Sequence, residues 1–156
     1  AGSPLASDKG SFAKRGRRYA QALNIPLAFI EKRRVDNEDH TEALSIIGQV
    51  SGRDIILIDD EIDTGGSICE AVHLAKQYGA EEVYVVFVHP VLSANAVERL
   101  ASLPVKQFIT TNTIPIPAEK KALFDDRLTI LSIGPLLGEV IKRANEGTSV
   151  GAMFNE

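Results

Sequence analysis

The sequence predicts an α/β fold in which a mostly parallel, twisted sheet is flanked by helices. Short runs rich in Val, Ile and Leu alternate with longer amphipathic segments, and this alternation is typical of strands joined by right-handed helical crossovers. Residues 54–59 (DIILID) and 81–90 (EEVYVVFVHP) are apolar over most of their length, as parallel strands covered on both faces are. The 156 residues suit one domain with a real core.

The N-terminal region is expected to begin with a helix. Residues 11–23 place Phe12, Tyr19 and Leu23 on one face and basic residues on the other. Residues 1–8 (AGSPLASD) offer at most a stub of a strand before this helix, and residues 1–5 are expected to be a cut end or a tag remnant. Residues 1–156 are expected to form a single domain.

A short flap or hairpin is expected around residues 27–50. Residues 25–34 (IPLAFIEKRR) form an apolar run that ends in charge, and residues 44–52 (LSIIGQVSG) form a second run closed by glycine. The polar residues between the two runs are typical of a loop.

The rest of the chain continues the alternation, and its helices carry end signals. Ser93 suits an N-cap, Pro135 suits the first helical turn, and Gly79 and Gly147 suit positions just past a helix end. The predicted strands are 54–59, 81–90, 105–111 and 127–133, and the predicted helices are 66–80, 93–102 and 134–147.

Composition excludes several classes of protein. The net charge of −4 argues against general nucleic-acid binding through phosphates, and no apolar run is long enough for a membrane span. One cysteine allows no internal disulfide, which fits a reducing compartment such as the cytoplasm. The three histidines and the one cysteine do not follow the ligand spacing of a zinc-type cluster.

Residues 55–72 (IILIDDEIDTGGSICEAV) hold the most informative pattern. Several acids follow an apolar strand, and a Gly-Gly-Ser turn then opens a helix. The string DTGGS matches the active-site pattern of aspartic proteases, but those enzymes pair two such aspartates in an all-β framework. The α/β pattern here argues against that interpretation.

The glycine turn instead has the properties of a phosphate site. Backbone N–H groups at a helix start lack intrahelical partners, and the helix dipole adds positive charge there. Gly65 and Gly66 allow close approach of an anion, and Thr64 and Ser67 add hydroxyl donors. The turn is not a P-loop, because no Lys follows the glycines.

The acids have a different expected ligand from the turn. Asp59 and Asp60, at the strand end, suit adjacent sugar hydroxyls, as the ribose-binding acid of dinucleotide folds does. A phosphate beside a diol describes a ribose 5-phosphate. Asp63 is expected to cap the N–H groups of its own loop. A plain turn with capping acids remains the alternative for a lone DTGG string.

The same residues resemble the phosphoribosyl diphosphate signature of type I phosphoribosyltransferases and ribose-phosphate diphosphokinases. The further segments PLAFIEKRR, VHPVLSANAVERL, TNTIPIP and ILSIGPLLGEVIKRANEGTSV resemble the C-terminal half of the diphosphokinases, in the same order. The resemblance covers the chain from about Ala6 to Phe154. It implies a phosphoribosyltransferase-like fold and a transferase that moves diphosphate from Mg-ATP to C1 of ribose 5-phosphate, giving phosphoribosyl diphosphate and AMP.

The resemblance also implies roles for particular residues. Lys32 and Arg34 match the catalytic loop of the family, and cations closing over a diphosphate would stabilise its charge. Asp59, Asp60 and the loop of Asp63, Thr64, Gly65, Gly66 and Ser67 would bind ribose 5-phosphate. Asp8 would contribute to a magnesium site, although a turn or capping role explains it about equally well.

The sequence lacks a match to the part of the family's enzymes that holds most of the ATP site. The family's ATP site lies largely in an N-terminal half that this sequence does not match, so the isolated chain is expected to bind ribose 5-phosphate but to turn over poorly. Two alternatives stay open: a type I phosphoribosyltransferase, and a non-catalytic regulatory homologue. The family further implies nucleotide biosynthesis, a homo-oligomer and a cytoplasmic location, without nucleic-acid or membrane partners.

Overall fold

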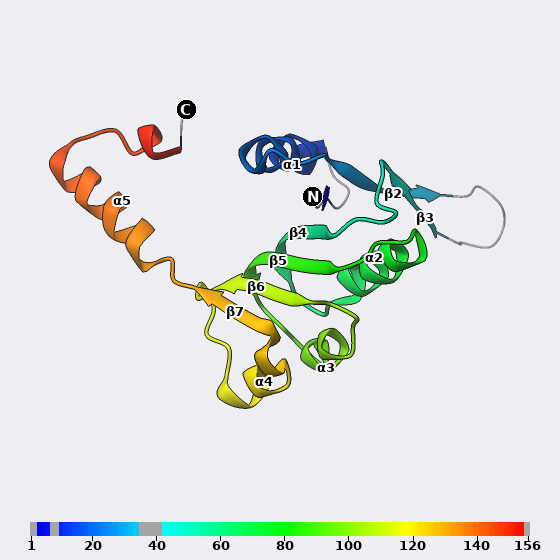
Figure 1. Cartoon of the computed structure of the whole chain (residues 1–156). Helices are drawn as coiled ribbons and strands as arrows, with labels where there is room; N and C mark the ends of the chain where they lie inside the picture. Colours follow the sequence, from blue (N-terminus) through cyan, green and yellow to red (C-terminus); the bar gives the residue numbers. More distant parts are fainter. Residues whose placement is uncertain (1–2, 7–9, 35–41, 155–156) are drawn as a thin grey trace.

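The described residues form one seven-stranded sheet covered by helices (Figure 1). The computed structural model describes residues 3–6, 10–34 and 42–154. The strand order is β3-β2-β1-β4-β5-β6-β7, and every neighbouring pair is parallel except β2 with β3. The strands are β1 (Ser3–Ala6), β2 (Ala28–Arg34), β3 (Glu42–Ile47), β4 (Ile55–Ile62), β5 (Val83–Pro90), β6 (Gln107–Thr111) and β7 (Leu128–Leu131). The predicted fold class is confirmed.

The short first strand occupies an interior position in the sheet. β1 lies between β2 and β4 and pairs with both, with Leu5 opposite Ala28 on one side and Leu57 on the other. Its four residues are too few for a periodic pattern. The expected stub therefore joins the N-terminal hairpin to the rest of the sheet.

The expected hairpin is present as the antiparallel pair of β2 and β3. Phe29 lies opposite Ile47, and Arg34 lies opposite Glu42. Of the polar residues 35–43, which were expected to form the tip, 35–41 lie outside the described residues, and Glu42 and Ala43 belong to β3. The pair forms one edge of the sheet.

Helices cover both faces of the sheet around β4 (Figure 1). Helix α1 (Gly10–Leu23) lies on one face, while α2 (Gly66–Gln77) and α3 (Ala96–Ala101) lie on the other. Alternate residues of the central strands fill the second interface, since Ile55, Leu57, Val85 and Phe108 are all at most 2% exposed. This packing fixes the start of α2 against the end of β4.

Among the predicted boundaries that differ from the structure, two concern the end of β4 and the start of α3. Strand β4 continues past Asp59 to Ile62, because Glu61 and Ile62 still pair with His89 and Pro90 of β5. Helix α3 begins after Asn95, and Ser93 instead belongs to the preceding turn, where its carbonyl accepts the N–H of Ala96. Both differences lie at the edge where the candidate ligand site sits.

The C-terminal part holds one short helix that the sequence did not reveal and one that it did. Helix α4 (Ala118–Ala122) and the 3-10 turns Asp125–Arg127 and Gly151–Phe154 were not predicted. Helix α5 (Gly134–Glu146) was predicted, and it has proline in its first turn and Gly147 at φ 67° as its cap.

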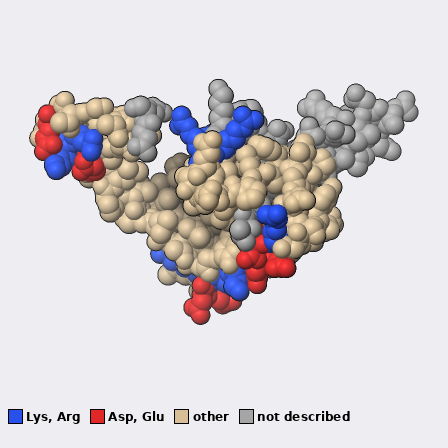
Figure 2. Space-filling model, turned by 45° about the horizontal axis from the view of Figure 1, so that its top comes forward, with Lys and Arg blue, Asp and Glu red and all other residues tan. Residues whose placement is uncertain are grey.

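Helix α5 stands away from the sheet (Figure 1) and buries none of its residues. Leu136, Leu137 and Ile141 are 46%, 48% and 68% exposed. Figure 2 shows both charge signs on α5, at the left, and basic side chains over α1, at the top. Within the described ranges, no helix has the length and apolarity that crossing a membrane requires.

Candidate functional site

The loop between β4 and α2 presents a row of backbone donors. Gly65 adopts φ 78° and ψ 1°, a left-handed conformation, and ends the loop at the N-cap of α2. Cys69 is the first residue whose N–H bonds back into this turn, to the carbonyl of Gly65. The N–H groups of residues 64–68 make no hydrogen bond within the described part of the chain. Together with the helix dipole, these donors make an anion site.

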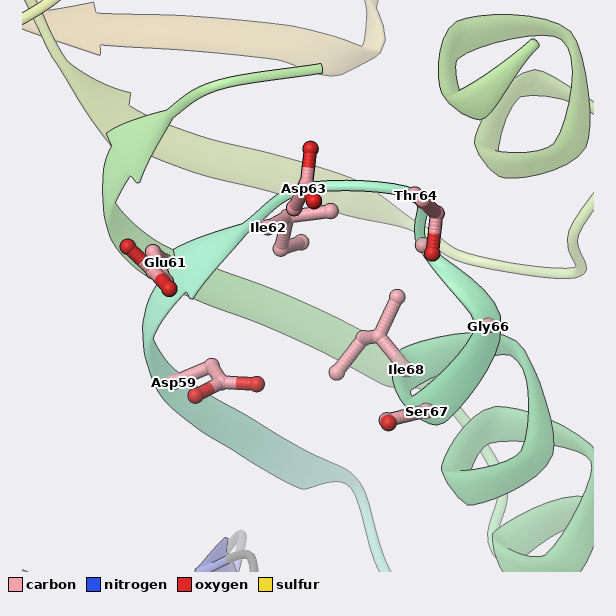
Figure 3. A pocket seen from close by; sticks show the side chains of 9 residues that line it. Asp59, Glu61, Ile62, Asp63, Thr64, Gly66, Ser67 and Ile68 are labelled. Carbon is pink, nitrogen blue, oxygen red and sulfur yellow. The ribbon is translucent and has the colours of Figure 1, made fainter. Parts of the chain in front are cut away.

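A hollow of about 170 Å³ lies between the end of β4 and the start of α2. In Figure 3, the carboxylate of Asp59 and the hydroxyl of Ser67 both point into the space that separates the two elements. The hollow is lined by Asp59, Glu61, Ile62, Asp63, Thr64, Gly65, Gly66, Ser67 and Ile68. Six residues predicted for the ribose 5-phosphate site thus lie together, namely Asp59, Asp63, Thr64, Gly65, Gly66 and Ser67.

Asp59 is the acid of the site with a perturbed pKa. The pKa of Asp59 is raised to about 6, and partial burial is the largest cause. A side-chain interaction with Asp60 and the negative charges of Asp60 and Glu61 act in the same direction. The backbone N–H of Asp60 donates to Oδ1 of Asp59 at 2.9 Å and opposes the shift. A carboxylate that is costly to ionise gains most from ligand donors, such as sugar hydroxyls, placed against it.

Asp60 is the one residue predicted for the ribose 5-phosphate site that does not line the hollow. Successive side chains of a strand point to opposite faces, and Asp60 does not line the hollow. Its carboxylate lies 3.9 Å from a guanidinium nitrogen of Arg15 on α1. Both side chains are about half exposed, so this ion pair is weak.

The expected capping role of Asp63 is not found. Its carboxylate accepts no hydrogen bond from the described residues, and in Figure 3 it points away from Ser67 and the start of α2. The backbone of Asp63 does the bonding, because its carbonyl accepts the N–H of Ser93 at 3.0 Å. This orientation keeps the negative charge away from the N–H groups that would face an anion.

Of the residues predicted for catalysis and metal binding, the structure describes two and leaves one out. Lys32 and Arg34 are on β2, opposite Leu44 and Glu42 of β3, and Asp8 lies outside the described residues. The described residues contain no group of three or more potential metal ligands. Asp59 and Glu61 are the two strand carboxylates that line the hollow.

Three lining residues were missed by the sequence prediction. Ile62 and Ile68 close the hollow from the strand and helix sides, and Glu61 adds a carboxylate at its edge. Glu61 follows Asp59 by two residues, so an extended strand puts both on one face. Continuing the predicted strand through Glu61 would have found it.

Sequence comparisons identify relatives of the whole chain. The chain is 43% identical over 150 residues to a ribose-phosphate pyrophosphokinase of Caldanaerobacter subterraneus subsp. tengcongensis, with 96% of this chain and 46% of that protein aligned. It is 45% identical over 152 residues to a protein of the same name from Synechococcus elongatus, with 96% and 44% aligned. The chain spans about half the length of the curated relatives that it matches.

Solved structures and a domain match agree with these relatives. A phosphoribosylpyrophosphate synthetase from Mycobacterium smegmatis superposes with a TM-score of 0.80 at 37% identity, over 93% of this chain and 45% of that one. An adenine phosphoribosyltransferase from Saccharomyces cerevisiae, at 23% identity and TM-score 0.52 over 67% of this chain and 65% of that one, shares the fold alone. Residues 37–155 match the phosphoribosyl synthetase-associated domain. Because that match covers most of the chain, the protein belongs to the phosphoribosyl synthetase-associated domain family.

Proposed function

We propose that this chain is the ribose 5-phosphate-binding half of a ribose-phosphate diphosphokinase. The observation that carries the proposal is the pairing of unbonded N–H groups at residues 64–68 with the carboxylate of Asp59 across one hollow. The N–H groups suit the 5-phosphate, and the carboxylate suits the ribose hydroxyls. The names of relatives at 43% to 45% identity support the same substrate.

The proposed reaction transfers diphosphate from ATP to C1 of ribose 5-phosphate, giving phosphoribosyl diphosphate and AMP. The C1 hydroxyl oxygen attacks the β-phosphorus, and the bond between that phosphorus and the α-phosphate oxygen breaks. Lys32 and Arg34, on the edge hairpin, are the cations proposed to stabilise the charge that develops on the phosphoryl oxygens. The proposed substrates are therefore ribose 5-phosphate and ATP.

Magnesium is the proposed cofactor. Mg²⁺ is usually held by one or two carboxylates together with substrate phosphates rather than by a full protein cage. Asp59 and Glu61 on one strand face fit that requirement, and Asp8 is a further proposed ligand. When bound, the ion neutralises charge on the diphosphate, while the chain itself positions the ribose.

The chain is proposed to act within a larger cytoplasmic enzyme of nucleotide biosynthesis that forms a homo-oligomer. The matched relatives are about twice as long, and the ATP-binding part is assigned to the portion that this chain does not cover. Accordingly, the chain alone should bind ribose 5-phosphate without efficient turnover.

Calorimetric titration of the 156-residue chain tests the proposal. Ribose 5-phosphate should bind, and ribose without phosphate should bind far more weakly, because the N–H groups of the loop then have no anion. No detectable binding of ribose 5-phosphate, with or without Mg²⁺, would overturn the proposal. Release of AMP from ATP by the chain alone, at a rate typical of enzymes, would contradict the assignment of the ATP site elsewhere.

A further inference from the structure

The outer side of the phosphate-binding loop is tied to the segment that precedes α3. The carbonyl of Ile62 accepts the N–H of Leu92 at 2.9 Å, and the carbonyl of Asp63 accepts the N–H of Ser93 at 3.0 Å. The carbonyl of Thr64 accepts a longer bond of 3.5 Å from Nη1 of Arg99. Successive carbonyls of the loop are thus all occupied by donors from residues 92–99.

These bonds decide where the N–H groups of the loop point. In a trans peptide the carbonyl and the following N–H lie in one plane and point in opposite directions. Because the Asp63 carbonyl points to Ser93, the N–H of Thr64 points away from that segment. The residues on this inner side, Thr64 among them, line the hollow.

The segment that supplies the donors is itself in an unfavourable backbone conformation. Leu92 and Ala94 adopt φ values of 50° and 48°, which non-glycine residues rarely do. Such residues persist only where the surroundings hold them. The Leu92 side chain is 2% exposed, and its backbone is held at both polar groups.

Lys120 on α4 holds the carbonyl of Leu92. Its Nζ donates to that oxygen at 2.7 Å, and the side chain is only partly exposed. The peptide group that joins Leu92 to Ser93 therefore accepts from an ammonium at one end and donates to the Asp63 carbonyl at the other. Hydrogen bonds linked in this way through peptide groups polarise one another.

We propose that Lys120 is a positioning residue for the phosphate-binding loop, acting through the Leu92–Ser93 and Asp63–Thr64 peptide groups. The ammonium fixes the first peptide, the first peptide fixes the second, and the N–H of Thr64 is thereby aimed at the anion and made a stronger donor. Lys120 does not line the hollow. The inference rests on the proposed ribose 5-phosphate site, and it adds a residue that acts on that site from another helix.

The neighbouring lysine provides a matched control. Lys121 lies on the same helix, is exposed, and makes no side-chain hydrogen bond within the described residues. Lys120→Met and Lys121→Met therefore carry the same net charge and differ in the bond to Leu92. Any general effect of removing a positive charge from α4 appears equally in both variants.

The first measurement does not need a ligand. In ¹⁵N-labelled free protein, the amide resonance of Thr64 should move in Lys120→Met and stay in place in Lys121→Met. The second measurement is the calorimetric affinity for ribose 5-phosphate, which should fall about tenfold in Lys120→Met and stay within about twofold in Lys121→Met. A purely structural lysine would lower the melting temperature without moving the Thr64 amide.

Each outcome separates the inference from the proposed function. An unmoved Thr64 amide, or equal affinities of the two variants, overturns the role of Lys120. If the wild type fails to bind ribose 5-phosphate, the proposed function fails, and the Thr64 amide still tests the relay. Should Lys120→Met not fold, Lys120→Gln replaces it, because its side-chain amide can keep a neutral bond to Leu92. Lys120→Gln should shift the Thr64 amide and lower the affinity for ribose 5-phosphate, both by less than Lys120→Met would. An amide position and an affinity equal to those of the wild type would overturn the inference.

Discussion

The backbone N–H of Asp60 donates to the carboxylate of Asp59 at 2.9 Å, yet the two side chains leave opposite faces of the sheet. Asp59 lines the hollow beside α2, whereas Asp60 lies 3.9 Å from Arg15 on α1. Adjacent acids in the sequence thus have different surroundings. Of the two, only Asp59 lines the hollow.

This separation predicts unequal effects of removing the two carboxylates. Asp59→Ala should weaken binding of ribose 5-phosphate about tenfold or more, because charge-assisted bonds to the hydroxyls are lost. Asp60→Ala should change the affinity by less than about threefold, since its exposed ion pair with Arg15 contributes little. Calorimetric titration of both variants measures the difference, and equal losses would contradict it.

The raised pKa of Asp59 predicts a pH-dependent stability difference. An unperturbed Asp titrates at about pH 3.9, and burial raises the pKa of Asp59 to about 6 in the folded protein. Between these values the folded state keeps a proton that the unfolded state releases. As pH rises from about 4 to about 6, this carboxyl therefore lowers the free energy of unfolding. Above about pH 6 the full destabilisation remains.

Asp59→Asn removes this effect and tests the sign. The free energy of unfolding of the variant, minus that of the wild type, should increase from about pH 4 to about pH 6 and then level off. Urea unfolding of both proteins at several pH values measures it. A difference that stays constant over that range, or that shrinks, would show that the carboxyl is not held in its protonated form by burial.

Two adjacent glycines should respond differently to substitution by alanine. Gly65 has φ 78°, so Gly65→Ala should cost about 1–2 kcal/mol of stability. Gly66 is in the first turn of α2 without positive φ, and an added Cβ would meet Thr64 Oγ1 only at 4.0 Å. Gly66→Ala should leave stability unchanged or raise it by up to about 1 kcal/mol. Urea unfolding of the pair provides the test, and similar losses would be inconsistent with the loop geometry.

The sequence predicted the apolar strands well and their polar ends poorly. Residues 55–58 and 83–87 have the apolar composition of covered strands, and both are strands. The continuation of β4 through Asp60 and Glu61 was missed, because charged residues after an apolar run look like a loop. Pairing with His89 and Pro90 keeps them extended, and that pairing depends on residues almost thirty positions away.

The donors of the site were predictable, but their orientation was not. A glycine turn before an amphipathic helix indicates free N–H groups from local sequence alone. The direction of the Asp63 carbonyl, and with it that of the Thr64 N–H, depends on the bond from Ser93, which joins segments distant in sequence. For the same reason, an amphipathic pattern predicted α5 but could not show that its apolar side chains stay exposed.

Arg127 should be the arginine whose loss costs the fold most among those with described bonds. Its Nη1 donates to the carbonyls of Leu103 and Val105 at 3.1 and 3.3 Å, and its Nη2 donates to that of Ala101 at 2.6 Å. These carbonyls lie at the end of α3 and just after it. One partly buried guanidinium therefore bonds the Ala101 carbonyl, which helix geometry leaves open, and two carbonyls of the turn that follows.

Arg127→Met should lower the free energy of unfolding by about 2–3 kcal/mol, because these carbonyls lose a charged donor. Arg127→Lys should recover only part of this loss, since an ammonium cannot match the fork of a guanidinium. Arg53→Met is the control, because Arg53 makes one exposed bond of 3.4 Å to Gln49, and it should cost less than about 0.5 kcal/mol. Urea unfolding measures all three variants. Full recovery by lysine would mean that a single charge, and not the fork, holds the end of α3.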